Sequence, residues 1–121
     1  MKIDFIADTN FLIYVLEGNK IIEPFLDYNF GISFISEVEL LGFKGIQSTD
    51  ELKLKQLIND CFGIEWNSEI KQMTIELRKK YTIKLPDAII AATSLVYGIP
   101  LVTADKAFSK INELDLILID F

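Results

Sequence analysis

The sequence predicts an α/β fold in which a parallel sheet of about five short strands is flanked by helices. Short apolar runs rich in strand formers alternate with longer helical patterns along the chain. Such alternation is typical of parallel strands joined by crossover helices that cover both faces of the sheet. The chain has 121 residues, half of them hydrophobic, and no linker, repeat or low-complexity tract divides it. We therefore expect one domain over residues 1–121.

Two strand-to-helix units come first. Residues 3–7 form an apolar run of strand formers, and the polar residues directly after it can cap a helix over 11–16. Residues 31–34 predict a second strand. A helix over about 36–41 follows and ends near Gly42.

The middle of the chain predicts two amphipathic helices with a short strand between them. Residues 50–60 and 67–81 carry apolar side chains at helical spacing among charged ones. Residues 63–66 predict the strand, which ends at Trp66, and we expect this tryptophan to pack in the core. Cys61 lies in an apolar stretch and is also expected in the core.

The last third of the chain predicts one apolar helix and two strands. The helix covers 87–97, with Pro86 in its first turn and Gly98 at its end. Its side chains are apolar on nearly all sides, which predicts a buried helix. Residues 101–103 and 116–119 supply the remaining strands.

The absence of histidine restricts the chemistry more than any other feature of the composition. With no histidine and one cysteine, the chain cannot form Ser-His-Asp or Cys-His catalytic sites, histidine zinc sites, zinc fingers, iron–sulfur clusters or internal disulfides. An enzyme built from this chain would rely on carboxylates. The net charge of −6 argues, as bulk charge, against a nucleic-acid partner.

The sequence gives no sign of export or of a membrane span. Asp4 stands where a signal peptide would need an unbroken apolar run. The uncharged stretch 88–104 is interrupted by Gly98 and Pro100. We expect a cytoplasmic protein without membrane contact, and a single free cysteine agrees with a reducing compartment.

Four acidic residues are candidates for a site, and two of them lie at the ends of predicted strands. Ligands of open parallel sheets bind outside the carboxyl ends of the strands. Asp8 directly follows the first predicted strand, and Asp105 follows 101–103 after one alanine. Asp87 opens the apolar helix, and Glu39 flanks the apolar face of the helix over 36–41. Taken singly, each has an ordinary explanation as a cap, a turn former, a helix-dipole partner or a solvated side chain.

Taken together, the motifs around these acids resemble the PIN domain. Within that family they are most similar to the small VapC-like toxins of toxin–antitoxin pairs. The similarity runs from about residue 3 to residue 121. The competing acid Glu37 lies two residues too early in its motif. Four strings carry the resemblance: Asp8-Thr9-Asn10, Ser36-x-x-Glu39-Leu40, Leu85-Pro86-Asp87-Ala88 and Leu101-Val102-Thr103-Ala104-Asp105-x-x-Phe108.

The resemblance implies a Rossmann-like fold and metal-dependent cleavage of RNA. It also implies a cognate antitoxin protein, and the apolar content is compatible with an antitoxin surface or a homodimer contact. The implied metal ligands and catalytic residues are Asp8, Glu39, Asp87 and Asp105. The implied supporting residues, which orient the acids, a water or the phosphate, are Asn10, Ser36 and Thr103.

The residues make independent sense of a divalent ion. Four carboxylates in one cleft repel each other, and the motifs contain no histidine or arginine that would balance them. Ligands that are all oxygen suit Mg²⁺ or Mn²⁺ better than zinc. Such an ion lowers the pKa of a bound water and orients it toward a phosphodiester. Cleavage by this route needs no histidine.

Contacts to the RNA backbone would depend on lysines. Lys106 and Lys110 follow Asp105 at a helical spacing, and Lys106 has the better claim because it is adjacent to the acid. The densest basic segment, residues 71–84, is interleaved with Glu76 and predicts a solvated face.

Other functions stay open on the sequence alone. A PIN domain can process RNA without an antitoxin, or act as a non-catalytic binding module, although a degenerate member would be expected to lack one of the acids. A phosphatase of the haloacid dehalogenase type would need an acid at the position of Asn10. A receiver-like domain would pair two acids near the first strand, which this chain does not do.

Overall fold

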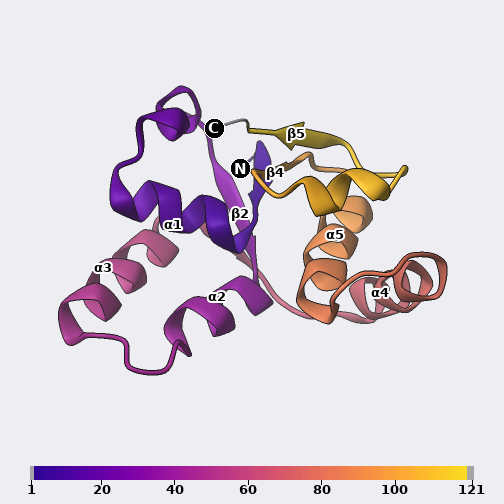
Figure 1. The fold of residues 1–121 in the computed structure, drawn as a ribbon, viewed down its shortest axis with the longest axis horizontal. Helices are drawn as coiled ribbons and strands as arrows, with labels where there is room; N and C mark the ends of the chain where they lie inside the picture. Colours follow the sequence, from indigo (N-terminus) through magenta and orange to yellow (C-terminus); the bar gives the residue numbers. More distant parts are fainter. Residues whose placement is uncertain (1, 120–121) are drawn as a thin grey trace.

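The computed structural model describes residues 2–119, and the predicted domain's Met1, Asp120 and Phe121 lie outside them. Five strands form one sheet in the order β3-β2-β1-β4-β5, and every neighbouring pair is parallel (Figure 1). This confirms the predicted α/β class and its short parallel strands. The strands are β1 (Phe5–Ala7), β2 (Phe30–Ser33), β3 (Phe62–Ile64), β4 (Leu101–Thr103) and β5 (Leu116–Leu118).

Helices cover both faces of the sheet, with α1 and α3 on one side and α4 and α5 on the other (Figure 1). The α-helices are α1 (Thr9–Glu17), α2 (Phe34–Leu41), α3 (Ser48–Asn59), α4 (Ser68–Lys80) and α5 (Leu85–Tyr97). There are also two 3-10 helices, η1 (Lys20–Phe25) between α1 and β2, and η2 (Lys106–Lys110) between β4 and β5.

The sheet separates two hydrophobic clusters. Successive side chains of a strand point to opposite faces, so Ile6 of β1 packs with α5 while Ala7 packs with Phe11 of α1. All three residues are fully buried. The sheet therefore has two covered faces, as the near-continuous apolar strands predict.

The strand order creates a switch point between β1 and β4. From β1 the chain moves to β2 and β3 on one side, and it then returns to place β4 on the other side of β1. Ala7 pairs with Val102, so the carboxyl ends of these two strands lie together. A switch point of this kind is where ligands bind in open α/β sheets.

Helix α5 matches its prediction closely. Residues 88–94 are all buried, Pro86 lies in the first turn, and Gly98 ends the helix in the left-handed conformation with φ of 65°. Although α5 is apolar, no helix within residues 2–119 has the length and apolar character needed to cross a membrane.

Several boundaries differ from the predictions. Helix α1 begins at Thr9, two residues early, because Asp8 is its N-cap. The 3-10 helix η1 was not predicted. Strand β3 ends at Ile64, so Trp66 lies beyond it and is 44% exposed, and the prediction of a core tryptophan is wrong. Cys61 is half-buried against the α1 side of the core.

Candidate active site

The four predicted acids line one small cavity at the carboxyl ends of β1 and β4. Its volume is about 130 Å³. The β1–α1 junction, α2, α5 and the β4–η2 junction each contribute one acid. The fold thus brings together residues from four separate parts of the sequence. The lining residues are Asp8, Thr9, Asn10, Glu39, Asp87, Ile90 and Asp105.

Asp8 is the most buried of the acids, at 3% exposure. Its Oδ1 accepts a hydrogen bond of 2.8 Å from the amide of Phe11, and its Oδ2 accepts one from the hydroxyl of Thr103. Burial raises the pKa of Asp8 to about 6. The two hydrogen bonds oppose this shift because they favour the charged form, and the charges of Asp105 and Asp87 add to it.

The surroundings of Asp87, in the first turn of α5, also raise the pKa of its carboxyl group. Burial raises its pKa, and the nearby charges of Asp105 and Glu39 raise it further. Lys84 and Lys110 act in the opposite direction. The acids of the cavity therefore repel each other electrostatically, and a bound cation would relieve that repulsion.

Glu39 is held by a residue that the sequence analysis did not assign to the site. The hydroxyl of Thr9 donates a 2.8 Å hydrogen bond to Oε1 of Glu39, and it lies 3.1 Å from Oγ of Ser36. Ser36, which was predicted to support the acids, is fully buried and reaches Glu39 only through Thr9. The only signal for Thr9 in the sequence was its place directly after Asp8.

Thr103 links two of the acids. It is fully buried, donates to Asp8 and accepts a 2.9 Å hydrogen bond from the amide of Asp105. Asp105 in turn caps η2, because its Oδ1 accepts from the amide of Ala107 at 2.9 Å. Asn10 lines the cavity with an exposed side chain.

The donor set fits a hard divalent ion. The lining side chains that carry ligand atoms offer oxygen from carboxylates, a hydroxyl and an amide. Within residues 2–119, no three His, Cys, Asp or Glu side chains are grouped closely enough to bind one ion directly. Mg²⁺ commonly takes one or two carboxylates and keeps several waters. The cavity therefore suits an ion held partly through water.

A second cavity, which we call the basic groove, adjoins the first. It measures about 670 Å³ and shares Asp87 and Asp105 with the acid cavity. Lys110 lies in its wall, whereas Lys106 is exposed and lines neither cavity. Residues 71–84 were predicted to form a solvated face, but two cations of this segment, Arg78 and Lys84, line the basic groove. The other lining residues are Arg78, Thr82, Ile83, Lys84 and Ala107.

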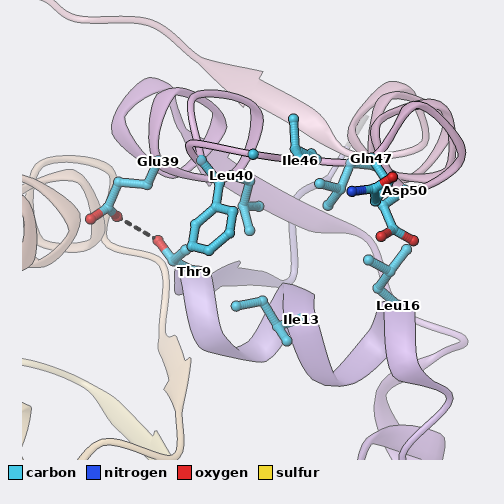
Figure 2. Close-up of a pocket in the computed structure, with 11 residues that line it drawn as sticks. Thr9, Ile13, Leu16, Glu39, Leu40, Ile46, Gln47 and Asp50 are labelled. Atoms are coloured by element: carbon cyan, nitrogen blue, oxygen red, sulfur yellow. Dashed lines mark hydrogen bonds between the residues drawn. The ribbon is translucent and has the colours of Figure 1, made fainter.

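A third cavity, the apolar groove, also adjoins the acid cavity. It measures about 420 Å³, and Thr9 and Glu39 line both. Figure 2 shows their hydrogen bond at one end of the groove and Asp50 at the other. Phe43 in its wall is 70% exposed. The remaining lining residues are Ile13, Leu16, Leu40, Gly45, Ile46, Gln47 and Leu54.

Comparison with known proteins agrees with the observed fold. The family model described as PIN domain matches residues 5–114. A comparison with curated proteins finds no significant match.

The solved structures that are similar over nearly the whole chain include the following three. A chain of a toxin–antitoxin complex from Klebsiella pneumoniae is 27% identical, with a TM-score of 0.80 over 94% of this chain and 96% of that one. A chain of VapBC-1 from nontypeable Haemophilus influenzae is 25% identical, with a TM-score of 0.81 over 96% of this chain and 98% of that one. A chain of VapBC2 from Rickettsia felis, bound to a promoter DNA fragment, is 21% identical, with a TM-score of 0.85 over 98% of this chain and 100% of that one.

Proposed function

The chain belongs to the PIN domain family, and from that premise we propose that it is an endoribonuclease that cleaves RNA with the help of a divalent metal ion. One observation carries the proposal: all four acids that match the family's motifs line a single cavity at the switch point of the sheet. The residues proposed to hold the ion, partly through water, are Asp8, Glu39, Asp87 and Asp105, and the proposed ion is Mg²⁺ or Mn²⁺.

The ion, when bound, would supply a water of lowered pKa and would balance the charge that develops on the phosphate. The protein's own part is to hold the acids in place. The hydrogen bonds from Phe11 and Thr103 favour the ionised form of Asp8, which is the form that binds a metal. Thr9 fixes one oxygen of Glu39 and leaves the other free.

Cleavage of a mixed RNA pool by the purified chain tests the proposal. We expect cleavage with Mg²⁺ or Mn²⁺, none with EDTA, and products with 5′-phosphate ends. Glu39→Gln should lose the activity, and Glu37→Gln, an equal change of charge on the same helix, should keep it. Cleavage in EDTA, or full activity of Asp8→Asn, would contradict the proposed site.

A thermal-shift titration with Mn²⁺ separates the proposed enzyme from a non-catalytic PIN-fold module. A ligand stabilises a protein that binds it, so stabilisation by Mn²⁺ would indicate a working metal site. Without cleavage of the pool, it would indicate that the enzyme cuts only a narrow RNA target. If the chain gains no stability from metal and cuts no RNA, the binding module becomes the better interpretation.

We further propose that the chain is the toxin of a toxin–antitoxin pair, rather than a processing nuclease that acts without an antitoxin. The support is the likeness to a chain of the Klebsiella pneumoniae complex, at 27% identity over 94% of this chain. The apolar groove is the surface on this chain that suits such a partner. It is bounded by α1, α2 and α3 and has a carboxylate near each end, Glu39 and Asp50 (Figure 2).

The expected partner segment carries an apolar stripe and cationic side chains that meet those carboxylates. Co-expression with the product of a small neighbouring gene, followed by purification, tests this. Phe43→Ser should weaken the complex at least about tenfold, because large apolar side chains dominate such contacts. Leu52→Ser is the matched control, since Leu52 is 60% exposed on α3 and lies outside the groove.

A further inference from the structure

The basic groove concentrates positive charge next to the acid cavity of an otherwise acidic chain. Three cations line it, Arg78, Lys84 and Lys110, together with the two acids that it shares with the acid cavity. The whole chain has a net charge of −6, and Arg78 is its single arginine. The groove is therefore locally positive, whereas the acid cavity beside it holds four carboxylates.

The backbone of the loop between α4 and α5 holds two of these cations. Arg78, near the end of α4, donates from Nη1 to the carbonyl of Ile83 at 3.2 Å. Lys110, at the end of η2, donates from Nζ to the carbonyl of Thr82. These bonds orient the side chains and leave further N–H groups of each free to bind another acceptor.

The cations of the groove are not neutralised by ion pairs. Among residues 2–119 the ion pairs at contact distance are Lys55 with Glu51 and Lys80 with Glu113. Neither involves the groove. Its positive charge is therefore available to an anion that enters from solvent.

The groove and the acid cavity form one continuous surface. Asp87 and Asp105 line both. Lys84 and Lys110 act electrostatically on Asp87, since they lower its pKa against the effect of burial. A polyanion that lies across this surface would meet the four acids and their ion first, and three unpaired cations next.

We propose that Arg78, Lys84 and Lys110 form a phosphate subsite that binds the RNA backbone beside the phosphate to be cleaved. The proposal rests on the proposed function, because it takes the acid cavity as the place of cleavage. Arginine offers a planar fork that suits phosphate, and lysine acts as a point charge. Such contacts position the strand and carry no sequence information. The subsite also explains how a chain of net charge −6 binds RNA.

Steady-state cleavage of a mixed-sequence single-stranded RNA in Mg²⁺ tests the subsite. The double variant Arg78→Gln/Lys110→Gln should raise KM at least about tenfold and change kcat by less than about twofold. Its apparent affinity should also depend less steeply on salt, by about 0.7 in the log–log slope for each lost phosphate contact. Arg78→Lys should recover part of the affinity.

The matched control is Lys79→Gln/Lys106→Gln, which removes the same charge from the same two elements at exposed positions outside the groove. An equal rise in KM in both double variants would overturn the proposal, since only total charge would then matter. An unchanged KM and salt slope in Arg78→Gln/Lys110→Gln would also overturn it. Melting temperatures of all variants verify that they fold.

RNA binding in EDTA, followed by the fluorescence anisotropy of a labelled oligoribonucleotide, separates this proposal from the proposed function. If the wild-type chain cuts no RNA and gains no stability from metal, the cleavage proposal fails by itself. Binding that is lost in the groove variant and kept in the control variant still supports a phosphate-binding groove. Equal binding by both variants overturns the groove whatever the outcome for cleavage.

Discussion

The hydroxyl of Thr103 donates a hydrogen bond to the carboxylate of Asp8, a residue 95 positions earlier in the chain. The bond fastens the carboxyl end of β4 to that of β1. The same hydroxyl accepts from the amide of Asp105. One buried side chain thus sets the relative position of two of the four acids.

Thr103→Val should therefore disturb both acids without changing the shape of the core. The amide of Asp105 would lose its acceptor, so we expect the free energy of unfolding to fall by about 1–3 kcal/mol. Cleavage should fall about 10- to 100-fold, as is common when a group that orients a metal ligand is removed. Thr103→Ser keeps the hydroxyl and should retain most of the stability and most of the cleavage activity. Equal losses in the two variants, measured by urea unfolding and by initial rates, would argue against this role of the hydroxyl.

Protonation of Asp8 should stabilise the metal-free protein as the pH falls. The folded-state pKa of about 6 lies above the usual value near 3.9, so the folded state holds this proton more tightly than the unfolded chain. Between pH 7.5 and pH 4 the gain is at most about 2–3 kcal/mol. Asp8→Asn lacks this titration.

The difference between the two proteins isolates Asp8 from the other carboxylates. In EDTA at pH 7.5, Asp8→Asn should be at least as stable as wild type, because it removes a charge from a buried position. Relative to wild type, this advantage should shrink as the pH approaches 4. Urea unfolding of both proteins across this range measures it, and a constant difference would contradict the raised pKa.

Stabilisation by metal should weaken in acid. Protons compete with the ion for the acids of the cavity, and Asp8 and Asp87 both have raised pKa values. The rise in melting temperature caused by Mn²⁺ should therefore be smaller at pH 5.5 than at pH 7.5, and EDTA should abolish it. The Asp8→Asn protein should gain less at either pH. A metal-dependent rise that is the same at both pH values would count against carboxylate ligands.

Thr9→Val should reduce cleavage by leaving Glu39 without its hydrogen bond. The expected loss is about 10- to 100-fold, with the RNA affinity little changed, since Thr9 acts on the carboxylate and does not reach the basic groove. Thr9→Ser should restore activity, because serine provides the same donor. If Thr9→Val and Thr9→Ser behave alike in kcat, the hydroxyl does not position Glu39.

Local sequence signals predicted the five strands and the five α-helices, whereas the four acids were selected through the resemblance of their motifs to the PIN domain. Asp8, Asp87 and Asp105 each lie at the end of an apolar strand or the start of a helix. Such boundaries depend on adjacent residues and can be predicted from them. Helix α1 began early because the same side chain that lines the cavity also caps the helix. The sequence offers capping and a place in the site as alternatives for Asp8, whereas its side chain caps α1 and also lines the cavity.

Contacts between elements could not be predicted in the same way. The bond from Thr9 to Glu39 depends on how α1 packs beside α2, and the orientation of Arg78 depends on how the end of α4 meets the loop before α5. Lys106 was preferred over Lys110 for its nearness in sequence. The turn of η2 instead directs Lys110 into the groove. Trp66 was placed in the core because β3 was expected to extend as far as that residue.

The sheet order also determines when the cavity comes into existence as the protein is synthesised. Ribosomes build the chain from its N-terminus, so β1 is complete long before β4, the strand that leads to Asp105. Until β4 pairs with it, one edge of β1 is open and Asp8 lacks the hydroxyl of Thr103. A nascent chain that stops before β4 carries at most three of the four acids. Any cleavage that depends on all four must therefore wait until β4 and Asp105 have been synthesised.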